Sequence, residues 1–252
     1  MADQTSTKPV EKAKESAQQS LEKETTSPPK REYRTFLFQM SLLAAIGAFA
    51  VLTFMVATIP SFPIDLEIER ALQSINSPIF AVLMSLISWP GFSPQSLIIS
   101  ALIAVVIYLF GLHWEALTAL VAASLPPMMN VIVKELIRRP RPPIDLVHVF
   151  RVLDSYSFPS GHVMFYTGFF GFLWFLVYTL LKHSWMRTLL LIFLGSLIGL
   201  IGISRIYLGQ HWPSDVLGAY LLGGITLVVI LQIYRWGKKR FFVHQPVAAK
   251  SD

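Results

Sequence analysis

The stretch Ser204-Arg205-Ile206-Tyr207-Leu208-Gly209-Gln210-His211-Trp212-Pro213-Ser214-Asp215 lies between two long apolar runs and carries a cation, an imidazole and a carboxylate. His211 and Asp215 are four residues apart, so a helix that begins near His211 would place both on one face of its first turn. A carboxylate that accepts the imidazole Nδ1–H leaves Nε2 as a free lone pair, which can act as nucleophile or base. Arg205 adds a rigid fork of donors suited to a phosphoryl group.

The composition is that of a membrane protein. Of 252 residues, 54% are hydrophobic and only 14% are charged, which is too apolar for an ordinary soluble domain. The net charge of +6 comes from clustered basic residues between apolar segments, so it indicates topology and contact with anionic lipid rather than nucleic acid. The chain has no cysteine, which excludes disulfides and thiolate metal sites.

Three regions follow from the distribution of apolar residues. Residues 1–34 are rich in Lys, Glu, Ser, Thr and Gln and cannot bury a core, so we expect a disordered cytoplasmic tail. Residues 35–236 form the membrane domain, and residues 237–252 form a basic cytoplasmic tail. The fold class is therefore all-α and polytopic.

The membrane domain is expected to contain six transmembrane helices. Residues 78–89 are apolar but too short to span a hydrocarbon core of roughly 30 Å, so they are expected to form an interfacial or re-entrant helix between the first two spans. The predicted spans are residues 36–59, 94–111, 115–136, 162–181, 187–207 and 215–236.

Basic residues fix the expected orientation. Under the six-helix layout, the cations before span one, between spans four and five and after span six share one face, which the positive-inside rule makes cytoplasmic. The opposite face also carries cations, against that rule, so something other than topology placed them there. We expect the functional site on this extracytoplasmic side of the plasma (inner) membrane.

Two further segments supply polar groups to that face. Lys134 to Pro142 delivers four cations within two turns, and these repel one another unless a phosphate or diphosphate neutralises them. Pro159-Ser160-Gly161-His162 opens span four, where a glycine allows close backbone approach and the first N–H groups of a helix bind anions.

Together the three segments resemble the signature of the type 2 phosphatidic acid phosphatase (PAP2) family. That signature is Lys, six residues, Arg-Pro; then Pro-Ser-Gly-His; then Ser-Arg, five residues, His, three residues, Asp. Every fixed position is present, at Lys134, Arg141, Pro142, Pro159, Ser160, Gly161, His162, Ser204, Arg205, His211 and Asp215.

The resemblance implies a metal-independent phosphatase without a cofactor. His211 would attack phosphorus and form a phosphohistidine, Asp215 would orient His211, and His162 would protonate the leaving oxygen and then activate water. The phosphoryl oxygens would be bound by Lys134, Arg141, Ser160, Gly161 and Arg205. No cluster of Asp, Glu and His has metal-ligand spacing in the sequence.

The expected partners are a lipid phosphate substrate and membrane lipids. Undecaprenyl diphosphate is the favoured substrate, because Arg138, Arg139 and Arg151 would add positive charge suited to a diphosphate and the family includes such enzymes. Phosphatidate and phosphatidylglycerol phosphate are the alternatives. A lipid-phosphate transporter or flippase without hydrolysis is the alternative of another class, although a carrier has no need of a His-Asp pair beside a second His.

Overall fold

A computed structural model describes residues 28–59 and 61–242. The chain divides into two compact units, Met1–Ala45 and Ile46–Asp252, and helix α2 (Pro28–Thr58) runs across the boundary between them. The second unit contains the remaining helices, which are α3 (Pro63–Gln73), α4 (Pro78–Ser88), α5 (Gln95–Leu109), α6 (His113–Ile137), α7 (Gly161–Phe165), α8 (Gly171–Leu180), α9 (Trp185–Tyr207) and α10 (Pro213–Gly237). A π-helical segment, Tyr166–Phe170, joins α7 to α8 into one continuous span.

The all-α membrane architecture predicted from the sequence is confirmed. Throughout the described residues the regular structure is helical, and five helical segments are long and apolar enough to cross a membrane. They are Tyr33–Thr58, His113–Ile137, Gly161–Leu180, Trp185–Tyr207 and Pro213–Phe241, which correspond to five of the six predicted spans.

The region between the first and third predicted spans differs from the prediction. Helix α5 has 15 residues, fewer than the roughly 20 that a bilayer requires. Helix α4 is a separate short helix, as predicted, but the sequence analysis missed α3, which precedes it and is bent from it by 119°. The α3 segment is polar on average, so no apolar run marked it as an element.

The predicted tail boundaries are shifted. Residues 28–34, assigned to the N-terminal tail, belong to α2, and residues 238–242, assigned to the C-terminal tail, continue the last helix as a π-helical turn. The expected disorder of residues 1–27 and the nature of residues 243–252 lie outside the described residues, so those two predictions stay predictions.

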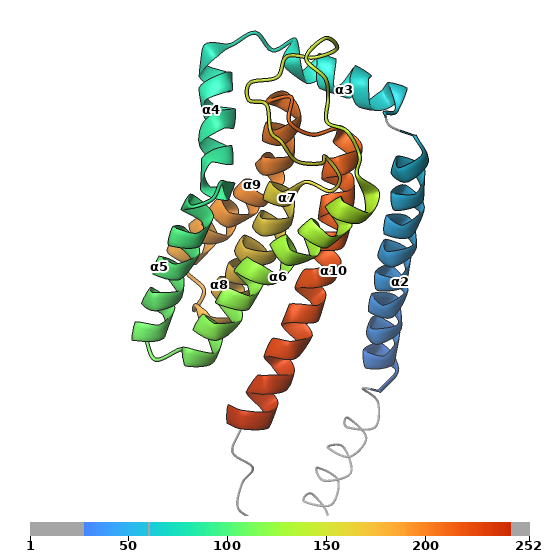
Figure 1. The fold of residues 1–252 in the computed structure, drawn as a ribbon. Coiled ribbons are helices and arrows are strands. Elements are labelled where there is room, and N and C mark those ends of the chain that lie inside the picture. The colour runs from blue at the N-terminus through green and yellow to red at the C-terminus, as the bar shows by residue number, and fades with distance from the viewer. Residues whose placement is uncertain (1–27, 60, 243–252) are drawn as a thin grey trace, which may run out of the picture. The chain divides into compact units, whose positions relative to one another are not determined.

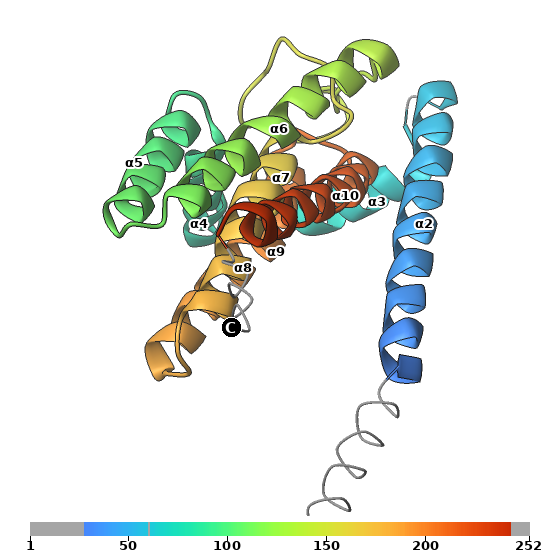
Figure 2. The ribbon, with the colours of Figure 1, turned by 90° about the horizontal axis from the view of Figure 1, so that it is seen from below.

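Close packing at the centre of the second unit places α6, α7 and α10 side by side (Figures 1 and 2). Gly168, in the π-helical segment after α7, lies against Pro126 of α6. A Cβ on Gly168 would lie 2.4 Å from Cγ of Pro126, so a larger residue would force this segment away from α6. A cluster of buried aromatic rings lies beside this contact, including Phe165, Tyr166 and Phe169. The rigid contact fixes the helix ends that carry the candidate site.

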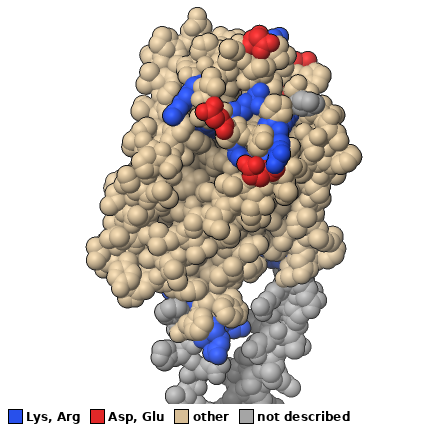
Figure 3. Space-filling view, in the orientation of Figure 1, with Lys and Arg blue, Asp and Glu red and all other residues tan. Residues whose placement is uncertain are grey.

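Those ends meet at the same end of the second unit. The loop of residues 138–160 connects α6 to α7 there and reaches the level of α3 (Figure 1). Helix α3 binds this loop, since Arg70 donates to the carbonyl of Leu146 at 3.2 Å and Gln73 donates to the carbonyl of His148 at 2.8 Å. On the face shown in Figure 3 most of the charged residues gather at this end, above a broad uncharged area.

Candidate active site

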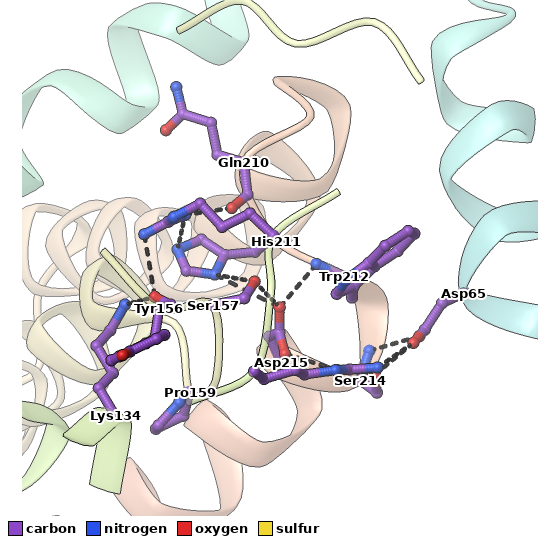
Figure 4. Close-up of polar contacts among 12 residues, drawn as sticks. Asp65, Lys134, Tyr156, Ser157, Pro159, Gln210, His211, Trp212, Ser214 and Asp215 are labelled. Carbon is purple, nitrogen blue, oxygen red and sulfur yellow. Dashed lines mark hydrogen bonds and ion pairs between the residues drawn. The ribbon is translucent and has the colours of Figure 1, made fainter. Parts of the chain in front are cut away.

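The candidate nucleophile His211 lies just before α10 and not within it. Helix α10 begins at Pro213 with Trp212 as its N-cap, so His211 does not share the first turn with Asp215, as it would if the helix began at His211. The two side chains nevertheless meet, with Nδ1 of His211 3.6 Å from Oδ2 of Asp215 (Figure 4). The same carboxylate oxygen accepts the backbone N–H of Trp212 at 2.9 Å, which ties Asp215 to the start of its own helix.

Ser157 completes this contact. Its hydroxyl donates to Oδ2 of Asp215 and lies 3.5 Å from Nδ1 of His211. Ser157 is fully buried and its backbone N–H donates to the carbonyl of Arg139 at 2.8 Å, so the hydroxyl is held in place by the loop. Ser157 was not predicted from the sequence, because a single serine near a motif carries no distinguishing signal.

Arg141 contacts the opposite nitrogen of the imidazole. Its Nη1 lies 3.3 Å from Nε2 of His211, and because a guanidinium can only donate, Nε2 must be the accepting nitrogen in this pair. Burial, together with the nearby cations Arg141, Lys134 and Arg205, lowers the pKa of His211 well below its ordinary value. Burial also lowers the pKa of Arg141 to about 10, which leaves it charged at neutral pH. The imidazole is therefore neutral, with its lone pair directed to the cationic side.

Arg205 and Ser160 present buried donors without partners. Arg205 is fully buried and donates from Nη1 to Oγ of Ser88 at 2.6 Å, whereas its Nε and Nη2 have no hydrogen-bond partner among the described residues. The hydroxyl of Ser160, also fully buried, is likewise unpartnered there. Buried donors left in this state are costly, and an anion bound at this position would satisfy them.

His162 occupies the second residue of α7. Its Nε2 is buried and has no hydrogen-bond partner among the described residues. The ring is packed edge-on against Phe92 at 4.5 Å between centroids, and a Cβ on Gly91 would lie 2.4 Å from its Cδ2. The segment after α4, which carries no family motif, therefore fixes the orientation of this imidazole.

The remaining predicted ligands lie on the α6 side of the site. Lys134 donates to the carbonyl of Tyr156, and Asn130, one helical turn earlier, donates to the carbonyl of Pro159 at 2.8 Å. A Cβ on Gly161 would lie 3.1 Å from Oδ1 of Asn130, so a side chain at position 161 would displace Asn130 from its hydrogen bond with Pro159. Asn130 is a second supporting residue that was not predicted from the sequence.

The structure separates the arginines that the sequence analysis grouped together. Arg139 is buried and ion-paired with Asp65 and Asp215 at 2.9 and 2.7 Å, so it does not add to the phosphate-binding charge. Arg138 is exposed, with φ of 52° at the end of α6. Arg151 is exposed and lies over the Phe92 ring, 5.4 Å from its centroid.

A groove leads from the site into the apolar part of the second unit. It has a volume of about 410 Å³, lies between α5, α6 and α7, and ends at Gly161 and His162. Small side chains such as Ser96, Ser100 and Ser124 keep it open. Its size is within the range of pockets that hold small molecules or lipid segments.

Metal ligands do not gather anywhere in the described part of the chain, where no group of three or more His, Cys, Asp or Glu side chains could hold a metal ion. The expectation of a metal-independent reaction stays a prediction.

The chain is similar to several known membrane phosphatases. It is 33% identical over 200 residues to phosphatidylglycerophosphatase B of Bacillus subtilis, covering 77% of this chain and 90% of that protein. It is 34% identical to phosphatidylglycerophosphatase B of Haemophilus influenzae over 101 residues, which are 40% of this chain and 41% of that protein.

Solved structures give the same result. The crystal structure of a transmembrane PAP2 type phosphatidylglycerolphosphate phosphatase from Bacillus subtilis matches with a TM-score of 0.69 and 28% identity, covering 79% of this chain and 98% of that one. The crystal structure of Aquifex aeolicus LpxE has the same fold, with a TM-score of 0.56 at 23% identity over 69% of this chain and 98% of that one.

The PAP2 superfamily matches residues 113–239, which include every residue named above for the site and its groove except Asp65, Ser88, Gly91, Phe92 and the groove residues Ser96 and Ser100. With the apolar helices and the phosphatases that resemble it, this match decides the identity: the chain belongs to the PAP2 superfamily and is a multi-pass membrane phosphatase.

Proposed function

We propose that the protein hydrolyses the phosphate monoester of a membrane phospholipid through a phosphohistidine. Nε2 of His211 attacks phosphorus in line, so that a P–N bond forms as the P–O bond to the lipid breaks. His162 gives a proton to the leaving lipid oxygen, then removes one from the water that cleaves the P–N bond, and inorganic phosphate is released.

The main support is the set of unpartnered buried donors at Arg205 and Ser160. They lie with His162 and Arg141 in a region of uncompensated positive charge, where a phosphoryl group would supply both the missing acceptors and the missing negative charge. The neutral His211, with its lone pair on that side, is in the state that a nucleophile requires.

Phosphatidylglycerol phosphate is the substrate that we favour. Two relatives are phosphatidylglycerophosphatases by name, and one of them is similar over 77% of this chain, which supports the alternative considered from the sequence over undecaprenyl diphosphate. A diphosphate is also less favoured, because the positive charge of Arg139, which was expected to suit it, is ion-paired with two carboxylates.

The groove between α5 and α6 offers a route for the lipid. Its apolar and small residues would accept the glycerol backbone and part of an acyl chain, while the headgroup phosphate reaches His162 and His211. By the distribution of basic residues, we place this end of the protein on the extracytoplasmic side of the plasma (inner) membrane.

The test is phosphate release by the purified protein from a panel of lipids that includes phosphatidylglycerol phosphate, phosphatidate and undecaprenyl diphosphate, each with and without EDTA. We expect turnover in EDTA, the highest kcat/KM for phosphatidylglycerol phosphate, and a labelled phosphohistidine after rapid quenching. His211→Ala should abolish turnover, and His113→Ala, at an exposed histidine outside the site, is the matched control. Phosphate release by folded His211→Ala would disprove the mechanism.

A further inference from the structure

A buried ion-pair network lies behind the catalytic carboxylate, formed by residues outside the family signature. Arg139 donates from Nη1 to Oδ1 of Asp215 at 2.7 Å and from Nη2 to Oδ2 of Asp65 at 2.9 Å. The side chains of Arg139 and Asp215 are fully buried, and that of Asp65 is 2% exposed. One guanidinium therefore joins two carboxylates in a region without water-exposed surface.

We propose that Asp65 and Arg139 are positioning residues for the reaction, which fix the Asp215 carboxylate in the orientation that holds His211. This inference rests on the proposed function, because it assigns a role to the support of the proposed nucleophile.

The division of contacts on Asp215 supports the proposal. Arg139 takes Oδ1, whereas Oδ2 receives the Trp212 N–H and the Ser157 hydroxyl and faces the imidazole Nδ1. With both oxygens assigned, the carboxylate plane cannot rotate without breaking a charge-assisted hydrogen bond. The His211 ring thus meets a carboxylate of fixed direction, as a nucleophile of this kind requires.

The location of Asp65 gives the pair a second anchor. Asp65 lies in the first turn of α3 and accepts the Ser214 backbone N–H at 2.8 Å and the Ser214 hydroxyl at 2.6 Å (Figure 4). Ser214 in turn accepts from Nη1 of Arg139 at 2.7 Å. Asp65 therefore holds both the arginine and the first turn of the helix that carries Asp215.

Two arginines in the short segment after α6 influence the two ring nitrogens of His211. Arg138 ends α6 in a left-handed conformation, and the two arginines that follow it make different contacts. Arg139 acts on the Nδ1 side through Asp215, and Arg141 contacts Nε2 directly. This arrangement requires arginine at position 139, since a lysine ammonium has no planar fork with which to join two carboxylates.

Three variants and one control test the inference in the purified full-length protein, with phosphatidylglycerol phosphate in detergent micelles as substrate. Arg139→Lys retains the charge and tests the fork, while Asp65→Asn retains the shape, removes the negative charge and replaces one of the two accepting oxygens with an NH2 donor. The double variant tests whether the two residues act as one unit. Arg138→Asn, at the exposed neighbour, is the control: it removes a positive charge next to Arg139 without touching the ion-pair network, and asparagine suits the left-handed backbone.

For Arg139→Lys we expect kcat to fall on the order of 100-fold with KM within about threefold of wild type, because a misplaced nucleophile affects the chemical step. For Asp65→Asn we expect a loss of about tenfold in kcat, and for the double variant a loss no larger than that of Arg139→Lys, since members of one unit are not additive. Arg138→Asn should match wild type.

Two results would overturn the proposal. Wild-type kcat in folded Arg139→Lys and Asp65→Asn, with only a lower Tm, would show a structural clamp, and a rise in KM at constant kcat would show a substrate ligand. His211→Ala distinguishes failure of the proposed function from failure of this inference. Turnover in His211→Ala would disprove the proposed mechanism. An inactive His211→Ala together with a fully active Arg139→Lys would disprove only the positioning role.

Discussion

Nη1 of Arg141 lies 3.3 Å from Nε2 of His211, so a group that can only donate contacts the nitrogen that carries the lone pair. The same imidazole faces Asp215 and Ser157 through Nδ1. One nitrogen of the buried ring thus lies beside a cation and the other beside a carboxylate. The neutral imidazole, with a lone pair on Nε2 and a proton on Nδ1, matches both neighbours.

The buried neutral state of His211 makes stability depend on pH. Its pKa is lowered well below the ordinary value in the folded protein, whereas the unfolded chain titrates near about 6.5. As the pH falls below this value only the unfolded state gains the proton, so stability falls by up to about 1.4 kcal/mol per pH unit until the folded pKa is reached. His211→Asn should therefore show a weaker dependence of Tm on pH between about 8 and 5.

His113→Asn is the control for that experiment, since His113 is exposed and remote from the site motif. It should retain the wild-type dependence of Tm on pH. An equal slope in His211→Asn and the wild type would show that another group causes the acid sensitivity.

Ser88, outside the family signature, accepts a hydrogen bond from Arg205, which we propose binds the phosphate. Ser88→Ala removes the acceptor 2.6 Å from Nη1 of Arg205, and a hydrogen bond to a charged group is worth about 1.5 to 3 kcal/mol, so kcat/KM should fall about 10- to 100-fold. Ser85→Ala, one turn earlier on the exposed side of α4, should leave kcat/KM unchanged. Equal kinetics in the two variants would contradict the assigned role of Ser88.

Gly91 leaves the space that the His162 ring occupies. A Cβ there would lie 2.4 Å from Cδ2 of His162, so Gly91→Ala should displace the imidazole and lower kcat by about 100-fold. Gly199→Ala is the comparison, because its Cβ would meet no atom within 4 Å. The measurement is steady-state turnover together with Tm, and unchanged kcat in Gly91→Ala would mean that His162 is free to move without consequence.

The groove predicts a difference between lipid and soluble substrates. Ser124→Trp should fill part of it and raise KM for a long-chain lipid phosphate about tenfold, the effect of roughly two CH₂ groups that lose contact at about 0.8 kcal/mol each. Hydrolysis of p-nitrophenyl phosphate, which has no acyl chain, should be unaffected. Met128→Trp, on the exposed side of α6, should change neither. A parallel loss on both substrates would point to damage at the phosphate site instead.

The sequence by itself determined the membrane class, five of the spans and the site motifs, because each of these is written in contiguous residues. Long apolar runs have one stable environment, and the motif residues lie at the ends of the runs that bring them together. Helix α3 was missed for the converse reason: its polar composition carries no such signal, and it is stabilised by contacts with α9, α10 and the 138–160 loop.

Only the tertiary structure decided which contacts the individual side chains make. The sequence does not distinguish Arg138, Arg139 and Arg141 from one another. In the structure Arg138 is exposed, Arg139 is buried between Asp65 and Asp215, and Arg141 contacts His211. Hydrogen bonds also join residues far apart in the chain, such as those that Ser157, Ser88 and Asn130 make. A hydrogen bond depends on position and direction in space, and these are set by how the helices pack rather than by any local pattern of residues.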